Sequence, residues 1–235
     1  MKIISLNVND FGGCCKHLEE YKNKYGYHAI SKWDGLNKEE DIQGIFSFIE
    51  NANPEVIVLQ EFDINSTEAK KFTGMLEKKG YELKSEPPSK RPSMTVMFVK
   101  RNICYKEIKT CHFKRSLRAY AIEIEDYIIY GTHVPPKYDE VFWDEIEEFW
   151  NDYKEHKFVM IGDINTINFR NNERLNKLLF NAIDVWRAKG NEEKISIAGD
   201  YAVISSNIDI ETVGIRKEES LCNYTDHPAM ILTLN

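Results

Sequence analysis

The stretch FVMIGDIN at residues 158–165 constrains the fold more than any other part of the chain. A continuous apolar run that stops at the polar residues Asp163 and Asn165 is typical of a central strand buried on both faces. Because side chains alternate along a strand, residues two apart point the same way, so the carboxylate and the amide are expected to converge at the end of the sheet. Left unpaired in a core, each would cost about 1–3 kcal/mol. The stretch therefore predicts a site for chemistry or, alternatively, an Asx-turn in which Asp163 caps the next segment.

The other apolar runs divide into strand-like and helix-like patterns. The first half of the chain alternates between strand and helix, and the part from Tyr81 to His133 is typical of short antiparallel strands. The expected strands are 2–8, 55–59, 94–100, 103–111, 118–125, 127–133, 158–162, 195–206, 208–213 and 229–234, and the expected helices are 41–52, 67–79, 141–156 and 171–189. This order predicts an α/β (α+β) layered fold, and the lack of a repeat or linker indicates one domain over residues 1–235.

Composition narrows the class of protein. The formal net charge of −7 counts against a protein that holds nucleic acid through charge alone, without excluding a nuclease that carries a divalent cation. The five cysteines are odd in number and include no CxxC pair, which indicates reduced, partly buried thiols. The N-terminal apolar run ends at Asn7, too short for a signal peptide, and no run of 18 apolar residues occurs. We therefore expect a cytoplasmic protein without a membrane span.

Polar side chains stand at the ends of several apolar strands. They are Asn7, Glu61, His133, Asp163, Asn165, Asp200, Asp226 and His227. Carboxylate oxygens hold Mg²⁺ through few protein ligands and leave positions for water and a phosphate. The metal neutralises phosphate oxygens, while an imidazole oriented by a carboxylate assists proton transfer. A site for a softer transition metal would carry more His or Cys at ligand spacing, so the pattern favours metal-assisted phosphoryl chemistry.

Six short motifs resemble, in order and rough spacing, those of the endonuclease/exonuclease/phosphatase superfamily. They are LNVND (6–10), QEF (60–62), THVP (132–135), GDIN (162–165), GDYAVIS (199–205) and TDHPAM (225–230). Each motif alone is weak, but the six together extend over nearly the whole chain. The resemblance implies a deoxyribonuclease I-like fold, which is a four-layer αββα sandwich of two packed, mixed, mostly antiparallel sheets.

The resemblance also implies roles for the polar residues. Glu61 would be the principal Mg²⁺ ligand, with Asn7 and Asp226 near the same metal and Mn²⁺ as a substitute. His227 would pair with Asp200 as the imidazole–carboxylate couple that acts on the phosphate or on the attacking water.

Four further residues receive roles from the same resemblance. Asp163 and Asn165 would orient the nucleophile and the scissile phosphate. His133 resembles the second histidine of deoxyribonuclease I and the phosphatases, although Ser93-Met94-Thr95 stands where those nucleases keep a carboxylate partner for it. Arg118 falls where family members often place an arginine that contacts phosphate, and its alternative interpretation is a surface arginine at the start of a strand.

The implied activity is hydrolysis of a phosphodiester by in-line attack of water. A nuclease that acts on DNA or RNA is the first hypothesis, with no obligate protein partner. The alternative is a phosphatase or phosphodiesterase that acts on a small phosphorylated molecule or a lipid headgroup, because substrate choice depends on the loops at 9–40, 84–93 and 137–140. A non-enzymatic binding module is disfavoured, since all eight polar positions are retained.

Overall fold

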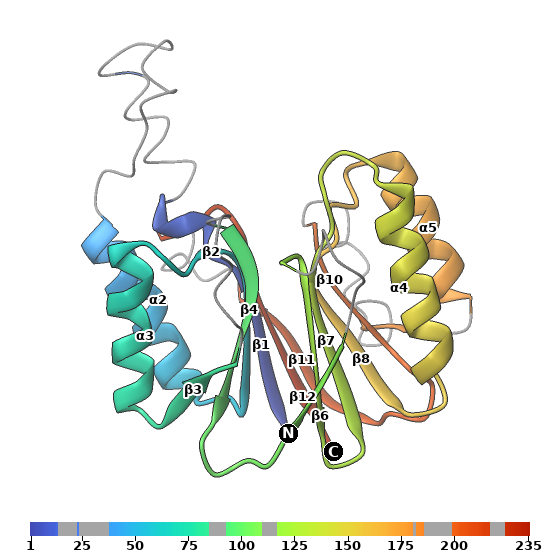
Figure 1. Ribbon diagram of the computed structural model, residues 1–235, viewed down its shortest axis with the longest axis horizontal. Helices are drawn as coiled ribbons and strands as arrows, with labels where there is room; N and C mark the ends of the chain where they lie inside the picture. The colour runs from blue at the N-terminus through green and yellow to red at the C-terminus, as the bar shows by residue number, and fades with distance from the viewer. Residues whose placement is uncertain are drawn as a thin grey trace.

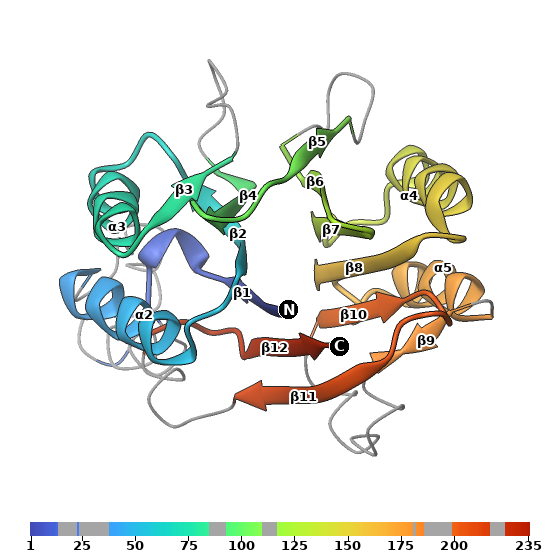
Figure 2. The ribbon, with the colours of Figure 1, turned by 90° about the horizontal axis from the view of Figure 1, so that it is seen from below.

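Two six-stranded sheets pack face to face, and helices cover both outer sides (Figure 1). Helices α2 (Lys38–Ala52) and α3 (Thr67–Lys78) lie over the first sheet, and α4 (Glu140–Tyr153) and α5 (Phe169–Leu179) lie over the second. Figure 2 shows the same four layers from below. The predicted four-layer αββα sandwich is confirmed. The structure is a computed structural model, and it describes residues 1–13, 23, 38–84, 93–109, 117–180, 182–185, 199–216 and 224–235.

The first sheet holds both ends of the chain. Its strands are β1 (Lys2–Asn7), β2 (Val56–Asp63), β3 (Tyr81–Leu83), β4 (Ser93–Lys100), β11 (Ile210–Arg216) and β12 (Ala229–Leu234). They lie in the order β11-β12-β1-β2-β4-β3, and of the pairs described only β1 and β2 run parallel. The two termini meet at one end of the sandwich, where the Met1 amine donates to the Leu234 carbonyl oxygen at 2.7 Å (Figure 1). The carboxyl ends of β1 and β2 therefore lie at the other end.

The second sheet repeats this arrangement. Its strands are β5 (Lys106–Ile108), β6 (Ala119–Ile124), β7 (Tyr127–His133), β8 (Lys157–Asp163), β9 (Ile183–Asp184) and β10 (Asp200–Ile204). They lie in the order β5-β6-β7-β8-β10-β9, with β7 and β8 parallel and the other described pairs antiparallel. Within the described residues, no helix has the length and hydropathy needed to span a bilayer.

Several predicted elements need correction. The helix expected at 171–189 is wrong at both ends: α5 begins at Phe169 with Asn168 as its N-cap and ends at Leu179, and β9 follows because Ile183 pairs with β10. Cross-strand pairing overrides the helical spacing there. Of the strand expected at 103–111, the described residues form β5 alone, and residues 110–111 lie outside them. Cys104 is exposed rather than partly buried, and the other four cysteines lie outside the described residues.

A glycine sets the distance between the sheets. A Cβ added to Gly131 on β7 would lie 2.5 Å from Cγ1 of Val58 on β2, so the two backbones approach more closely here than a side chain would allow. His133 follows two residues later on the same face of β7. The close approach therefore brings the end of β7 opposite the end of β2.

The layer between the sheets changes from apolar to polar toward the edge where β2 and β7 end. On β1, Ile3 belongs to the core, while Ser5 accepts a buried hydrogen bond of 3.0 Å from Gln60 on β2. On β8, Ile161 belongs to the same core, and Asp163 stands one step further along that face. Asp163 is buried at this end, while the Glu61 side chain is 34% exposed, so the tip of the layer is open to solvent on the Glu61 side.

Candidate active site

Strand register brings the predicted residues to one edge of the sandwich. In the first sheet, Asn7 pairs with Gln60 where β1 and β2 end side by side. In the second sheet, His133 pairs with Asp163 at the ends of β7 and β8, and Asp200 pairs with Asp163 at the start of β10. Residues separated by up to 193 positions in the chain thus share one edge.

Side chains from the two sheets contact one another across the layer. Asn7 Nδ2 donates to Asp163 Oδ2 at 3.3 Å. His133 Nε2 lies 3.6 Å from Glu61 Oε1 and 3.6 Å from Asp163 Oδ2. Asn7 and Glu61 come from the first sheet and His133 and Asp163 from the second, so the site exists only when the two sheets are packed together.

A bulge in β2 aims Glu61 into this site. Simple alternation would put Gln60 and Glu61 on opposite faces of the strand. The pairing of β2 with β4 shifts between Leu59 and Phe62, and Glu61 has a φ of 50°, a left-handed conformation that is uncommon for a residue other than glycine. The irregularity keeps Phe62 in the core and still leaves the Glu61 carboxylate 3.6 Å from His133.

Gly162 allows β7 and β8 to pair up to their last residues. Its φ is 151°, and a Cβ there would lie 1.9 Å from the carbonyl oxygen of Thr132. Any side chain would push the two strands apart just before His133 and Asp163. The glycine of the GDIN motif is thus required by the backbone.

Asp163 fits both interpretations of the sequence, because it faces the site and also forms an Asx-turn. Its Oδ1 accepts the backbone N–H of Asn165 at 3.0 Å, which is an Asx-turn, while its Oδ2 faces Asn7 and His133. Asn165 lies beyond the end of β8 with a φ of 50°, and its Nδ2 donates to the Val134 carbonyl oxygen at 2.8 Å. The expected convergence of the two side chains at one point is therefore wrong, because the strand ends before Asn165 and its amide is turned toward the β7–α4 loop.

His227 and Asp200 form the expected imidazole–carboxylate couple. His227 Nδ1 lies 2.9 Å from Asp200 Oδ2, and its Nε2 lies 3.9 Å from Asp163 Oδ2 and 4.0 Å from Asp226 Oδ1. Burial alone would lower the pKa of His227, but the hydrogen bond to Asp200 and the surrounding carboxylates outweigh it and raise the pKa to about 9. The imidazole is therefore a cation at neutral pH.

The carboxyl groups of the site repel one another. Burial, followed by the charge of Asp200, raises the pKa of Asp163 to about 6. Burial also raises the pKa of Glu61, and the charges of Asp226 and Asp163 add to this effect. Buried negative charge of this kind favours a bound cation.

The oxygen donors present fit a hard divalent cation. Glu61 and Asp226 offer carboxylates; Asn7 Oδ1 accepts the backbone N–H of Asn9 at 2.9 Å, which leaves one lone pair for a metal. In the part of the chain that the structure describes, no cluster of three or more His, Cys, Asp or Glu side chains has the arrangement of a metal site. Carboxylate and amide oxygens are ligands that Mg²⁺ accepts while keeping several waters, whereas zinc sites are built mostly from His and Cys.

The Nδ1 atom of His133 faces an arginine rather than a carboxylate. Arg118 Nη1 lies 3.3 Å from His133 Nδ1. Because arginine only donates, Nδ1 accepts and the proton of the neutral ring is on Nε2, which faces Glu61 and Asp163. Burial, then the charges of Arg118 and His227, lower the pKa of His133 to about 3. A neutral His133 in this tautomer donates toward the carboxylates, and Arg118 contacts the ring.

Two residues near the site were not singled out from the sequence. Asp10, in the short 3₁₀ helix η1 (Asn9–Phe11), has its pKa raised to about 6 by burial and by the charges of Glu61 and Asp63. Thr225 is buried and donates through Oγ1 to the Asn7 carbonyl oxygen at 2.7 Å. Both belong to motifs of the resemblance, LNVND and TDHPAM, which is the signal that could have identified them.

Comparison with known proteins gives the fold. Neither a family model nor a curated protein sequence matches the chain. Among solved structures, an AP endonuclease from Archaeoglobus fulgidus superposes with a TM-score of 0.68 at 13% identity and covers 100% of this chain and 99% of its own. D. rerio TDP2 complexed with single strand DNA product gives 0.64 at 14% identity, with 100% and 98% covered. An endonuclease/exonuclease/phosphatase family protein from Leptotrichia buccalis gives 0.64 at 16% identity, with 100% and 99% covered. The chain therefore has the endonuclease/exonuclease/phosphatase fold, and the superposition covers its whole length.

Proposed function

We propose that this chain, which has the endonuclease/exonuclease/phosphatase fold, is a divalent-metal-dependent hydrolase that cleaves the phosphodiester bonds of nucleic acid. The observation that carries the proposal is the meeting of Glu61 and Asp163 with the His227–Asp200 pair at one edge of the sandwich. The names of two structures with this fold, an AP endonuclease and a protein complexed with a DNA product, support nucleic acid as the substrate class.

Glu61, Asp226 and Asn7 are the residues that would hold Mg²⁺, with Mn²⁺ as a substitute. When bound, the ion supplies a positive charge that neutralises phosphate oxygens. Glu61 is held for this task by the bulge in β2 and by the neighbouring Asn7 amide, which lowers the pKa of the carboxyl against the effect of burial.

His227 acts on the phosphate through Nε2. Its Nδ1 is engaged by Asp200, so the Nε2–H is the group that faces the site, beside Asp163 and Asp226. As a cation, the ring donates this hydrogen to a phosphate oxygen as negative charge develops in the transition state. Asp200 is 2% exposed and fixes the ring orientation.

Asp163 orients the attacking water. Its Oδ1 is occupied by the Asn165 backbone, and its Oδ2 lies among Asn7, His133 and His227, at the centre of the site. A carboxylate fixed in this way accepts a hydrogen bond from water and takes its proton as the bond to phosphorus forms. Water then attacks in line with the leaving oxygen, the bond from phosphorus to that oxygen breaks, and the departing oxygen takes a proton from solvent. No covalent intermediate with the protein is formed.

The proposal is tested with purified protein and four end-labelled or colorimetric substrates. These are a DNA strand, an RNA strand, a DNA duplex and a panel of phosphomonoesters that includes inositol phosphates. We expect cleavage of a nucleic acid with Mg²⁺ or Mn²⁺, none in excess EDTA, and none by Glu61→Gln. Release of phosphate from the monoesters with no cleavage of any nucleic acid would assign the site to small phosphorylated molecules instead.

A further inference from the structure

Two large apolar side chains are exposed in the turn between β8 and α5. Ile167 is 84% exposed and Phe169 is 72% exposed. They follow Asp163 by four and six residues, in the segment that leaves the edge of the sandwich where the candidate active site lies. Single exposed apolar residues are ordinary on protein surfaces, whereas exposed apolar groups that gather in one place can form a contact surface.

Hydrogen bonds to neighbouring segments fix the backbone of the turn, so Ile167 and Phe169 are exposed on a rigid backbone. The backbone N–H of Asn168 donates to the Asn165 carbonyl oxygen at 3.1 Å, and its Nδ2 donates to the Pro136 carbonyl oxygen at 3.0 Å. The buried Asn171 donates through Nδ2 to the carbonyl oxygens of Pro135 at 3.0 Å and Asn165 at 3.3 Å. A surface fixed in this way can bind a partner without losing much conformational entropy.

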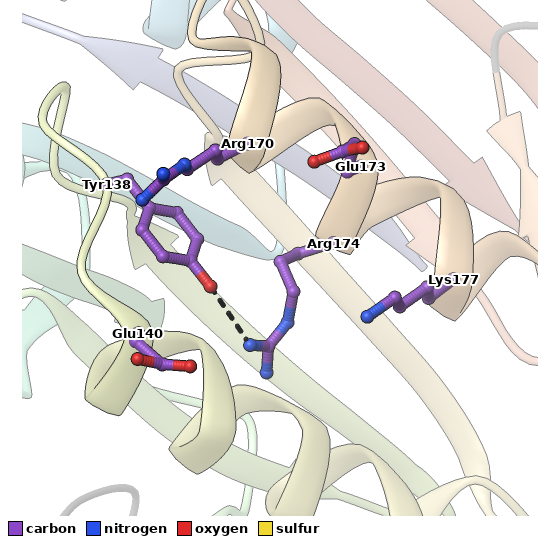
Figure 3. A pocket seen from close by; sticks show the side chains of 6 residues that line it. All are labelled: Tyr138, Glu140, Arg170, Glu173, Arg174 and Lys177. Carbon is purple, nitrogen blue, oxygen red and sulfur yellow. Dashed lines mark hydrogen bonds between the residues drawn. The ribbon is translucent and has the colours of Figure 1, made fainter.

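A pocket lined by Tyr138 and by residues of α4 and α5 lies next to the same turn (Figure 3). The Arg170 guanidinium lies 5.3 Å from the centre of the Tyr138 ring, and Arg174 Nη1 donates to the Tyr138 hydroxyl at 3.2 Å. Arg174 also donates to Asp144 and Glu147, at 2.6 Å each. The pocket has a volume of about 390 Å³ and is lined by Tyr138, Glu140, Arg170, Glu173, Arg174 and Lys177. Arg174 is thus paired with two carboxylates, and its contacts hold α4, α5 and Tyr138 together.

Helix α5 begins at the edge of the sandwich that carries the site. The helix starts where β8 ends, and side chains on a helix lean toward its N-terminus. Its buried residues are Asn171, Arg174, Leu175 and Leu178. Phe169 lies off this buried face, so its ring projects from the outer side of the first turn.

The first turn of α5 carries a positive charge, which is unfavourable at the positive end of the helix dipole. It contains no acidic residue, and the exposed Arg170 stands at the positive end of the helix dipole. A partner that combined an apolar face with negative charge would compensate both features. An unpaired nucleobase with its flanking phosphate has this chemistry, whereas in a duplex the base faces are already stacked on one another.

We infer that Ile167 and Phe169 bind unpaired nucleobases beside the scissile phosphate, with Arg170 next to the flanking phosphate, so that single-stranded nucleic acid is the preferred substrate. The inference rests on the proposed function and adds to it the form of the substrate. Phe180, at the far end of α5 and 88% exposed, provides a matched control for Phe169.

The test compares kcat/KM of the wild type with that of Phe169→Ala, Ile167→Ala and Phe180→Ala. Three substrates of one sequence are used: a single strand, its duplex, and a single strand with abasic nucleotides on both sides of the cleaved bond. We expect the wild type to prefer the single strand. Phe169→Ala should lower kcat/KM on that strand by about 5- to 150-fold, mainly through KM, which corresponds to the loss of one stacked base. Ile167→Ala should act in the same direction.

The duplex and the abasic strand separate base contact from a structural effect. On both, we expect Phe169→Ala to match the wild type within about twofold, and Phe180→Ala to match it on all three substrates. Equal behaviour of Phe169→Ala and Phe180→Ala on the single strand would overturn the inference and leave the proposed function standing. So would an equal loss by Phe169→Ala on the abasic strand. Failure of the wild type to cleave any of the three would overturn the proposed function, and the inference with it.

Discussion

Asp200→Asn tests how the protein sets the charge of His227. The wild-type ring has a pKa of about 9, against an ordinary value of 6.5, and the hydrogen bond and charge of Asp200 are the main causes that raise it against burial. At 1.36 kcal/mol for each pKa unit, this upward shift corresponds to roughly 3 kcal/mol of stabilisation of the imidazolium. Asparagine keeps the shape and an acceptor oxygen but removes the charge. Burial then dominates, and we expect the pKa of His227 to fall to 6.5 or below.

The assay is a pH titration of the histidine side chains by NMR on metal-free protein. His227 in the wild type should be protonated at pH 7 and lose its proton as the pH rises through about 9. His133 is an internal control, because burial and Arg118 lower its pKa to about 3 and it should remain neutral over the same range. Asp226→Asn is the matched variant: its carboxylate is 4.0 Å from Nε2 and makes the smaller contribution, so the pKa should fall less than in Asp200→Asn.

The same change should reduce turnover. If the cationic His227 donates to the phosphate, Asp200→Asn should lower kcat by about 10²- to 10⁴-fold at neutral pH, the range for loss of a proton-transfer group. A His227 pKa that stays near 9 in Asp200→Asn would refute the electrostatic reasoning. A wild-type value near 6.5 would do the same.

Three further changes test other parts of the account. Glu61→Gln, or excess EDTA with the wild type, should abolish hydrolysis while circular dichroism stays unchanged, because the ligand and not the fold is lost; residual metal-dependent turnover in Glu61→Gln would contradict its role. Gly131→Ala places a methyl group 2.5 Å from Val58 and should lower the free energy of unfolding, measured in urea, by about 1–3 kcal/mol. Activity should fall as well, because the sheets move apart. Unchanged stability would show that the sheets are not in close contact there. Burial, followed by the charge of Glu40, raises the pKa of Asp41 from 3.8 to about 7, so ionisation of Asp41 should destabilise the folded protein as the pH rises from about 4 through 7. Asp41→Asn should weaken this pH dependence in thermal melts at several pH values. An identical pH profile in the variant would refute the reasoning.

The sequence predicted the parts of the structure that follow from period and strand ends. Apolar runs located β1, β2, β7 and β8, with Asn7, Glu61, His133 and Asp163 at or near their ends; the parallel pairing of β1 with β2 and of β7 with β8 was not predicted. The His227–Asp200 couple followed from the family motifs and is present at 2.9 Å. The strand positions depend on short-range rules that the sequence carries directly, whereas the His227–Asp200 couple depended on the resemblance to a known family.

The parts that could not be predicted depend on irregular backbone and on contacts between distant segments. Alternation would put Glu61 on the outer face of β2, and only the bulge with its positive φ returns it to the site. The turn of Asn165 toward Val134 has the same kind of cause. The pairing of Ile183 with β10 ended a helix that the leucine spacing would have continued. No local pattern encodes the contact between Arg118 and His133, because it is made across two strands.

Paramagnetic broadening by Mn²⁺ tests the central claim most directly, namely that a cation held by Glu61, Asn7 and Asp226 lies against Asp163 of the other sheet. Backbone amide signals of the metal-free protein are assigned, and Mn²⁺ is added in substoichiometric steps. The account predicts that the amides of residues 7, 61, 163 and 226 broaden together and first, and that Glu61→Gln abolishes the effect. Broadening confined to one sheet, or centred on another part of the surface, would contradict it.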